Sequence, residues 1–321
     1  MARLNAGGDA TVTKVSCGSP GNCAAFGYYA ASTDKYGSPD DFRMFVVSET
    51  NGKWSAAHPV PTAGRSGSVS CAGVGYCVAG GSGPKGQAFI VVWKNGAWST
   101  GTKVPGMAVL TGIGTGGSGV NTVSCTSRGN CTAGGWYTHG TDGFNKRAFV
   151  VSETNGKWGN AIRLKGIPAA GSGEPGGLWS VSCASAGNCA GGGLYSVSEF
   201  KTQAFVVAER NGVWDAAIKV PGIATLNTGG FAWVNSVSCA SAGNCAASGR
   251  YYDGSEEHPF VVAEKNGVWG TAVDVPGTDA LYVHGAGFPY VNPVSCVHGG
   301  RCVIGGSYND SSGTQVSVTA P

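Results

Sequence analysis

The sequence predicts an all-β protein, a six-bladed β-propeller of four-stranded antiparallel blades, and three observations carry this prediction. The 321 residues include 56 glycines, while the residues that favour helices are sparse. Cysteine pairs with five residues between them recur six times along the chain. An Asn-Gly dipeptide stands two residues before a tryptophan in each of the first five units. A repeat of this length with several internal turns is typical of a propeller blade.

The sequence of each repeat predicts four short strands separated by turns. In the fifth unit these are residues 234–239, 245–252, 258–264 and 268–276. Asn266-Gly267 joins the last two, and Asn-Gly is a strong signal for a tight hairpin because both residues accept positive φ. We expect one propeller domain over residues 1–321, with repeats at approximately 12–61, 69–105, 120–166, 179–221, 234–276 and 291–321.

The last unit ends after its third strand, so either the last blade has three strands or the chain is trimmed there. How the ring closes is not visible in the sequence. A solenoid would have a shorter repeat without internal hairpins, and a row of separate domains would need linkers that this chain lacks. The second strand of each unit consists of Ala, Gly and Ser, which predicts close packing between neighbouring strands.

The cysteine spacing predicts one disulfide per blade. The pairs are Cys17–Cys23, Cys71–Cys77, Cys125–Cys131, Cys183–Cys189, Cys239–Cys245 and Cys296–Cys302. Structural zinc is the alternative, but zinc sites favour shorter spacings and four gathered ligands. We therefore expect no metal and no cofactor. Six disulfides predict a secreted, extracellular protein, with its signal peptide removed and Met1 added for expression.

The charge pattern does not indicate a particular class of binding partner. The formal net charge is +3 and charged residues make up 12% of the chain, so neither nucleic acid nor an anionic membrane is indicated. Long apolar runs are absent as well, and we expect no membrane insertion.

Recognition is expected on one face of the propeller, where the loops differ between units. The turns that carry the cysteines and the Asn-Gly dipeptides are nearly constant, whereas the other connections vary in length and chemistry, as recognition loops do. Aromatic rings beside polar groups suit sugar rings and also protein partners. The candidate ligand-binding residues are Trp179, Phe231, Trp233, Tyr282, Phe288, Tyr290 and Asp9, with Tyr36, Phe42, Phe144 and Phe200 in the outer loops. Alternatively, Trp179 and Trp233 fill the mouth of the channel.

Catalytic signals are weak. The five histidines share no repeat position, and the sequence lacks the motifs of hydrolases and metallopeptidases. The acidic stretch 253–258 does not have the spacing of a calcium loop. We therefore expect a protein that is not an enzyme.

The repeat, of the form SVSCxSxGNCxAGGxY followed by AFVVxExNGxW, resembles that of secreted actinomycete β-propeller proteins, a group that includes lectin-like proteins and proteins like the dispase autolysis-inducing protein. The resemblance covers almost the whole chain. It implies a non-enzymatic protein that either binds glycans or is cross-linked in the cell wall by transglutaminase. The second role needs reactive glutamines, and the candidates are Gln87, Gln203 and Gln315.

The sequence thus predicts a secreted binding module that recognises a glycan through its variable face. A protein-interaction or cell-surface scaffold is the second hypothesis, with a cell-surface protein as partner.

Overall fold

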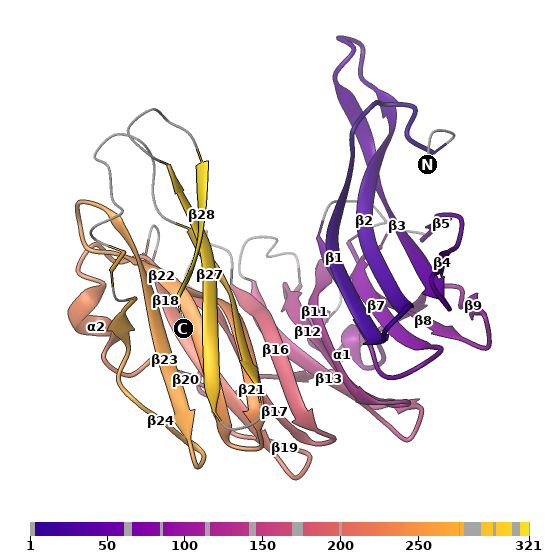
Figure 1. Ribbon diagram of the computed structural model, residues 1–321. Helices are drawn as coiled ribbons and strands as arrows, with labels where there is room; N and C mark the ends of the chain where they lie inside the picture. The colour runs from indigo at the N-terminus through magenta and orange to yellow at the C-terminus, as the bar shows by residue number, and fades with distance from the viewer. Residues whose placement is uncertain are drawn as a thin grey trace. The chain divides into compact units, whose positions relative to one another are not determined.

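The computed structural model describes residues 4–60, 66–83, 86–112, 116–140, 146–168, 176–198, 201–275, 277–278, 290–297, 300–309 and 315–320. The chain forms two compact units, one of Met1–Gly143 with Phe149–Arg163 and the other of Phe144–Ala148 with Leu164–Pro321. Each unit contains a series of twisted antiparallel sheets (Figure 1). The six sheets follow one another along the chain as propeller blades, and the predicted fold class is confirmed.

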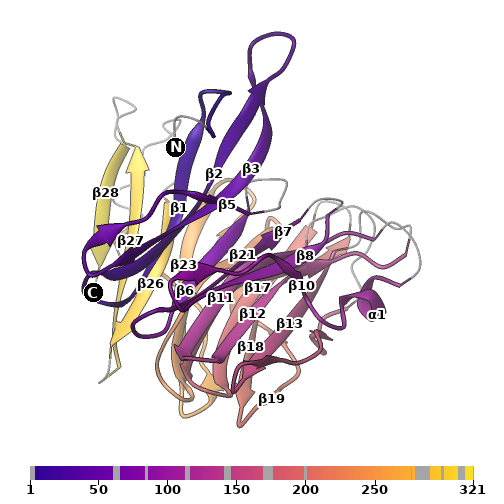
Figure 2. The same cartoon turned by 90° about the vertical axis from the view of Figure 1, so that its right-hand side faces the viewer.

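The first three strands of each blade run antiparallel in chain order. The first strands are β1 (Ala10–Ser19), β6 (Gly67–Cys71), β11 (Ser118–Ser127), β16 (Gly177–Ser185), β21 (Ala232–Ser241) and β26 (Tyr290–Val297). The second strands are β2 (Asn22–Thr33), β7 (Tyr76–Ser82), β12 (Asn130–Tyr137), β17 (Asn188–Ser198), β22 (Asn244–Tyr252) and β27 (Arg301–Asn309). The third strands are β3 (Pro39–Thr50), β8 (Ala88–Lys94), β13 (Arg147–Thr154), β18 (Lys201–Arg210), β23 (Glu257–Lys265) and β28 (Gln315–Ala320). Figure 2 shows β11, β12 and β13 side by side in blade 3.

The fourth strand of blades 1 to 5 is broken in two, where the sequence predicted a continuous strand. Its pieces are β4 (Lys53–Trp54) and β5 (His58–Pro59), β9 (Ala97–Trp98) and β10 (Thr102–Lys103), β14 (Lys157–Trp158) and β15 (Ile162–Arg163), β19 (Val213–Trp214) and β20 (Ile218–Lys219), and β24 (Val268–Trp269) and β25 (Val273–Asp274). In blade 5 the pairing moves from Glu264↔Trp269 to Phe260↔Asp274, which inserts one extra residue. Such an insertion is a β-bulge, and it bends the outer strand. In the described part of blade 6 the sheet has three strands.

The Asn-Gly hairpins are confirmed. Asn51, Asn95, Asn155, Asn211 and Asn266 have φ between 50° and 54°, and each following glycine also has positive φ. This conformation belongs to the two-residue turn whose twist matches the flanking strands.

Among the described residues, two short helices lie in the connections between blades, α1 (Met107–Thr111) and α2 (Ile223–Leu226). Neither helix, nor any other in the described ranges, is long and apolar enough to cross a membrane.

The core lies between adjacent blades. One apolar cluster joins blades 1 and 2, a second joins blades 2 and 3, and a third joins blades 4 and 5. Glycines of the second strand allow this packing, as the sequence predicted. A Cβ added at Gly192 would lie 2.5 Å from Cγ1 of Val234 in the next blade. Within blade 4, one at Gly193 would lie 2.0 Å from the carbonyl oxygen of Gly177 on the neighbouring strand.

Hydrogen bonds from one blade to the next explain the constant SVSC motif. Within each of the two compact units, the serine before the first cysteine of a blade accepts a hydrogen bond. Its donor is the backbone N–H of the first cysteine in the following blade. The bonded pairs are Cys71 with Ser16, Cys125 with Ser70, Cys239 with Ser182 and Cys296 with Ser238, at 2.9 to 3.0 Å. The serine therefore aligns successive blades.

Candidate functional site

One end of each blade, which we call the disulfide end, carries the cysteines and the Asn-Gly turn. In blade 4, Asn188 donates to Ser185 Oγ at 3.1 Å and accepts the backbone N–H of Asn211 at 3.2 Å. The N–H of Gly212 donates to the carbonyl oxygen of Gly187 at 2.9 Å. The asparagine of the repeated GNC sequence therefore joins the two turns of its own blade, and its repetition has a structural cause.

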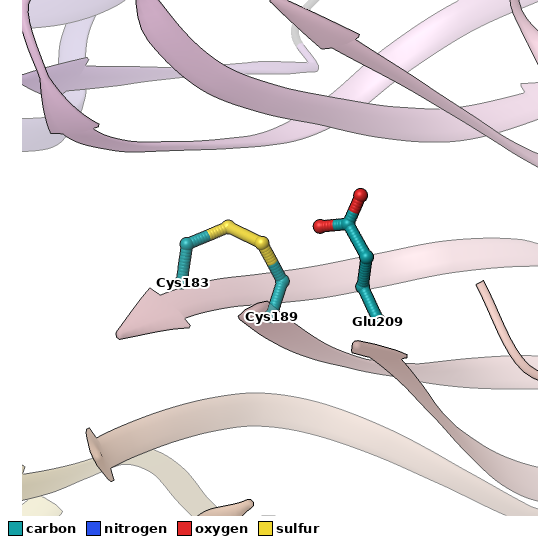
Figure 3. Close-up of side chains that lie close together, drawn as sticks. All are labelled: Cys183, Cys189 and Glu209. Carbon is teal, nitrogen blue, oxygen red and sulfur yellow. A yellow bond between two sulfur atoms is a disulfide. The ribbon is translucent and has the colours of Figure 1, made fainter. Parts of the chain in front are cut away.

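All six predicted disulfides are present, with Cα–Cα distances of 3.9 to 4.0 Å. The separation is shorter than the 4.4 to 6.8 Å that most disulfides show, because the two cysteines lie directly opposite each other on paired strands. Glu209 lies beside the disulfide of Cys183 and Cys189 (Figure 3). Because both sulfur atoms are already bonded to each other, this group offers no thiolate to a metal.

Buried acids also lie at the disulfide ends. Tyr76 donates to both carboxylate oxygens of Glu153, at 2.7 and 2.8 Å, across the interface of blades 2 and 3. Burial raises the pKa of Glu153, while the Tyr76 hydroxyl and Lys94 oppose the shift. Burial likewise raises the pKa of Glu264, which lies 3.7 Å from Arg210. Tyr76, Glu153 and Glu264 are each no more than 5% exposed, so a substrate does not reach them.

The opposite end of each blade is the variable end, and in blade 5 it holds Phe231 and Trp233, two of the predicted binding residues. In blade 5, the strands β21, β22 and β23 lie side by side (Figure 1). A register shift between Val234 and Ser236 places Trp233 opposite Arg250. Since neighbouring residues of a strand point to opposite faces, Phe231 and Trp233 share one face of the blade.

Trp233 and Arg250 form the centre of this face. The Arg250 guanidinium lies 4.9 Å from the centre of the Trp233 ring, within the distance of a cation–π interaction. Its Nη1 atom lies 2.8 Å from Oε2 of Glu257 on the third strand. The Arg250 side chain is 14% exposed and that of Glu257 26%, so this ion pair is partly shielded from water.

An aromatic pair lies beside this cation–π contact, two residues further along the paired segments. The rings of Phe231 and Tyr252 pack edge to face, with centres 6.3 Å apart. The N–H of Tyr252 donates to the carbonyl oxygen of Phe231 at 2.8 Å, and Tyr252 is paired with Glu257 on the other side. We call Phe231, Trp233, Arg250, Tyr252 and Glu257 the blade-5 surface. All five side chains are partly exposed.

The turn beside the blade-5 surface is held by Asp253. Its Oδ1 accepts hydrogen bonds from the N–H groups of Ser255 and Glu256, at 2.7 and 2.8 Å, and from the Ser255 hydroxyl at 2.7 Å. These bonds, the one from Glu256 first, hold the pKa of Asp253 well below its ordinary range. His258 lies 3.2 Å from the other oxygen. Asp253 is therefore an ionised turn residue and a poor proton donor.

Trp179 occupies a different register from Trp233. It lies at the irregularity between Leu178 and Ser180 in β16, the position that Asn235 occupies in blade 5. Its exposed fraction is 37%. The two predicted tryptophans are therefore not repeat equivalents, although both belong to the second unit.

The other predicted residues are scattered. Asp9 is half-buried and its backbone oxygen accepts the N–H of Ala30 at 2.7 Å. Tyr36 is 80% exposed at the tip of the β2–β3 hairpin, which extends beyond the other blades of its unit (Figures 1 and 2), and Phe42 packs against Tyr28 on that hairpin. The predictions for Phe144, Phe200, Tyr282 and Phe288 lie outside the described residues, as do the side chains of Tyr290 and Gln315.

Sequence reasoning missed Arg250, Tyr252 and Glu257. The sequence gives little indication of their role, because each residue type occurs once at its repeat position. Their role becomes visible only when the strand pairing shows which residues lie opposite them. In the sequence the acidic stretch 253–258 raises only the question of a metal site, whereas in the structure it forms a turn held by Asp253 beside Arg250.

Comparison with known proteins agrees with the fold. No family model matches this chain, and no curated protein matches it. Among solved structures it is similar to the subtype N11 neuraminidase-like protein of a flat-faced bat influenza virus, with 12% identity, a TM-score of 0.50, and coverage of 97% of this chain and 86% of that one. It is also similar to the six-bladed propeller lectin of Aleuria aurantia, with 11% identity, a TM-score of 0.46, and coverage of 95% and 90%. At such identities the likeness is one of fold alone.

Proposed function

We propose that the protein is a secreted, non-enzymatic module that binds glycans through the blade-5 surface. The observation that carries this proposal is the group of partly exposed aromatic rings in Phe231, Trp233 and Tyr252, beside the polar side chains of Arg250 and Glu257. Aromatic rings stack against the C–H faces of sugars, while charged groups hydrogen-bond their hydroxyls. The predicted kinship with secreted actinomycete propellers is part of this proposal.

The placement of the acids supports a binding role over glycoside hydrolysis. Hydrolysis needs a carboxylic acid of raised pKa beside the sugar and a second carboxylate close to it. The described glutamates of raised pKa, Glu153 and Glu264, are buried at the disulfide ends. At the variable end of blade 5, the pKa of Asp253 is lowered instead.

A glycan array followed by calorimetry tests the proposal. We expect Trp233→Ala and Phe231→Ala each to weaken binding of a positive glycan at least about tenfold, because each removes a stacking ring. The matched control is Trp54→Ala, since Trp54 is half exposed but lies at a disulfide end. Trp179→Ala reports whether the tryptophan on β16 belongs to the same site. Absence of any binding glycan, or equal losses in the Trp233 and Trp54 variants, would contradict the proposal.

A cross-linked surface scaffold is the second candidate function, favoured by the exposure of Gln87 before β8. The side-chain oxygen of Gln203 is buried, so Gln87 is the better substrate. Transglutaminase labelling with a fluorescent amine, read by peptide mapping, should then mark Gln87 before Gln203. Labelling of neither glutamine would reject this function.

A further inference from the structure

We infer that Glu257 is a specificity-determining residue that restricts the blade-5 surface to neutral glycans, by occupying the arginine that an acidic sugar would need. The inference rests on the proposed function and names the class of ligand. Its basis is the geometry of Arg250, which lies between Trp233 and Glu257.

Arginine is the side chain best suited to a sugar carboxylate, because its planar guanidinium offers paired donors. In this protein part of that capacity is already taken, because Glu257 Oε2 accepts from Nη1 at 2.8 Å. The Nε atom is buried, and the Trp233 ring lies against the guanidinium. A sugar carboxylate that binds Nη1 would have to displace Glu257 from it.

Displacement would be unfavourable because of where the pair lies. The side chains of Arg250 and Glu257 are only 14% and 26% exposed. Separating a half-buried pair leaves a charge without its partner in a poorly hydrated place. Glu257 is also held in position by the strand pairing of β22 and β23, so it competes as a group that is already ordered.

The surrounding charges act in the same direction. The adjacent turn carries the carboxylates of Asp253 and Glu256, and Asp253 is kept ionised by its hydrogen bonds. An incoming anion is repelled by these groups at short range. Lys201, near Gly230, is exposed, and an exposed cation is screened by water and salt. Neutral hydroxyl groups meet no such barrier, and they hydrogen-bond to either partner of the ion pair.

The test uses pairs of monosaccharides that differ only at C6. Methyl glucoside, galactoside and mannoside are compared with the matching methyl uronides by calorimetry on the full chain. For at least one pair we expect the wild type to bind the neutral member at least about tenfold more tightly. Glu257→Gln, which keeps the shape and removes the charge, should reduce that preference at least about tenfold.

Two further variants are the controls. Glu256→Gln removes the same charge from the adjacent turn and leaves the Arg250–Glu257 pair in place, so it should reduce the preference much less than Glu257→Gln does, and an equal reduction in both variants would contradict the inference. Adding Arg250→Gln to Glu257→Gln should abolish the gained uronide binding. Thermal unfolding checks that each variant is folded, and Glu257→Ala is the second variant at that position.

The outcomes separate the two claims. If neutral sugars bind and Glu257→Gln and Glu257→Ala leave the preference unchanged, the specificity inference is wrong while the proposed function stands. If the wild type binds uronides as tightly as neutral sugars, the inference is likewise wrong. If neither class binds the wild type or the Glu257 variants, the proposed function itself fails.

Discussion

The two ends of a blade use the same strands in opposite ways. At the disulfide end of blade 4, Cys183–Cys189, Asn188 and the Asn211-Gly212 turn form contacts that recur in other blades. At the variable end of blade 5, Trp233, Arg250 and Glu257 form contacts that belong to that blade's own sequence. Repetition therefore marks structure in this protein, and departure from the repeat marks the candidate site. Changes at the disulfide ends and in the strand interiors should affect stability and leave binding intact.

The largest expected effect comes from a strand interior. In Gly193→Ala the new Cβ would lie 2.0 Å from the carbonyl oxygen of Gly177, a backbone atom that cannot move alone. We expect a loss of about 3 kcal/mol or more in the free energy of unfolding, measured by urea titration. Gly270→Ala is the control, because its added Cβ would lie 3.5 Å from the nearest atom, at ordinary contact distance. Equal stability of the two variants would show that the strands around Gly193 leave room for a methyl group.

Removing one disulfide should have the next largest effect. Replacing Cys239 and Cys245 together by serine opens a short loop, and the loop-entropy model gives a loss of about 2 kcal/mol. Because these cysteines lie at the opposite end of blade 5 from Trp233, glycan affinity should be unchanged below the unfolding transition. A large loss of affinity in the folded variant would contradict the division between the two ends.

A smaller loss is expected when a serine between blades is removed. Ser182→Ala deletes the acceptor of the Cys239 N–H at 3.0 Å. The expected cost is about 1 kcal/mol, the typical worth of a partly buried hydrogen bond. Ser185→Ala is a matched control, since its partner is the side chain of Asn188 within the same turn. Urea unfolding compares the two variants, and an equal or smaller loss for Ser182→Ala would show that the bond between blades contributes little.

The smallest effect should be a pH dependence from Glu153. Its pKa is raised above the ordinary value of 4.5, so its folded form favours the neutral acid. The stability that it contributes is present below that ordinary value and is lost as the pH rises through the raised pKa. Relative to Glu153→Gln, the wild type should therefore become less stable as the pH rises from the ordinary value of 4.5 through the raised pKa. A difference in urea midpoints that stays constant or moves in the opposite direction would reject this assignment.

The repeat made most of the fold predictable. The Asn-Gly turns, the six disulfides and the antiparallel blades follow from residues whose local chemistry decides their conformation. The break in the fourth strand is not visible in the sequence, because an inserted residue such as the one between Trp269 and Val273 has no sequence signal of its own.

The candidate site was only half predictable, and the reason is register. The sequence predicts Phe231 and Trp233 as candidate ligand-binding aromatic residues. Their partners depend on the irregularity between Val234 and Ser236. Without it, continuation of the Ser236↔Ser248 pairing would place Trp233 opposite Tyr251. A shift of one residue exchanges every partner across the strands, so Arg250 and Glu257 emerge only from the folded chain.

The hydrogen bond from a cysteine N–H to the serine of the preceding blade also has a kinetic consequence. The amide protons of Cys71 and Cys239 are protected by the neighbouring blade through Ser16 and Ser182. Their exchange with deuterium therefore reports the opening of an interface, whereas amides paired inside a blade report the unfolding of that blade. In a repeat protein, stability divides into terms for the repeats and terms for their interfaces. These cysteine amides would let the interfaces of blades 1 and 2 and of blades 4 and 5 be timed separately.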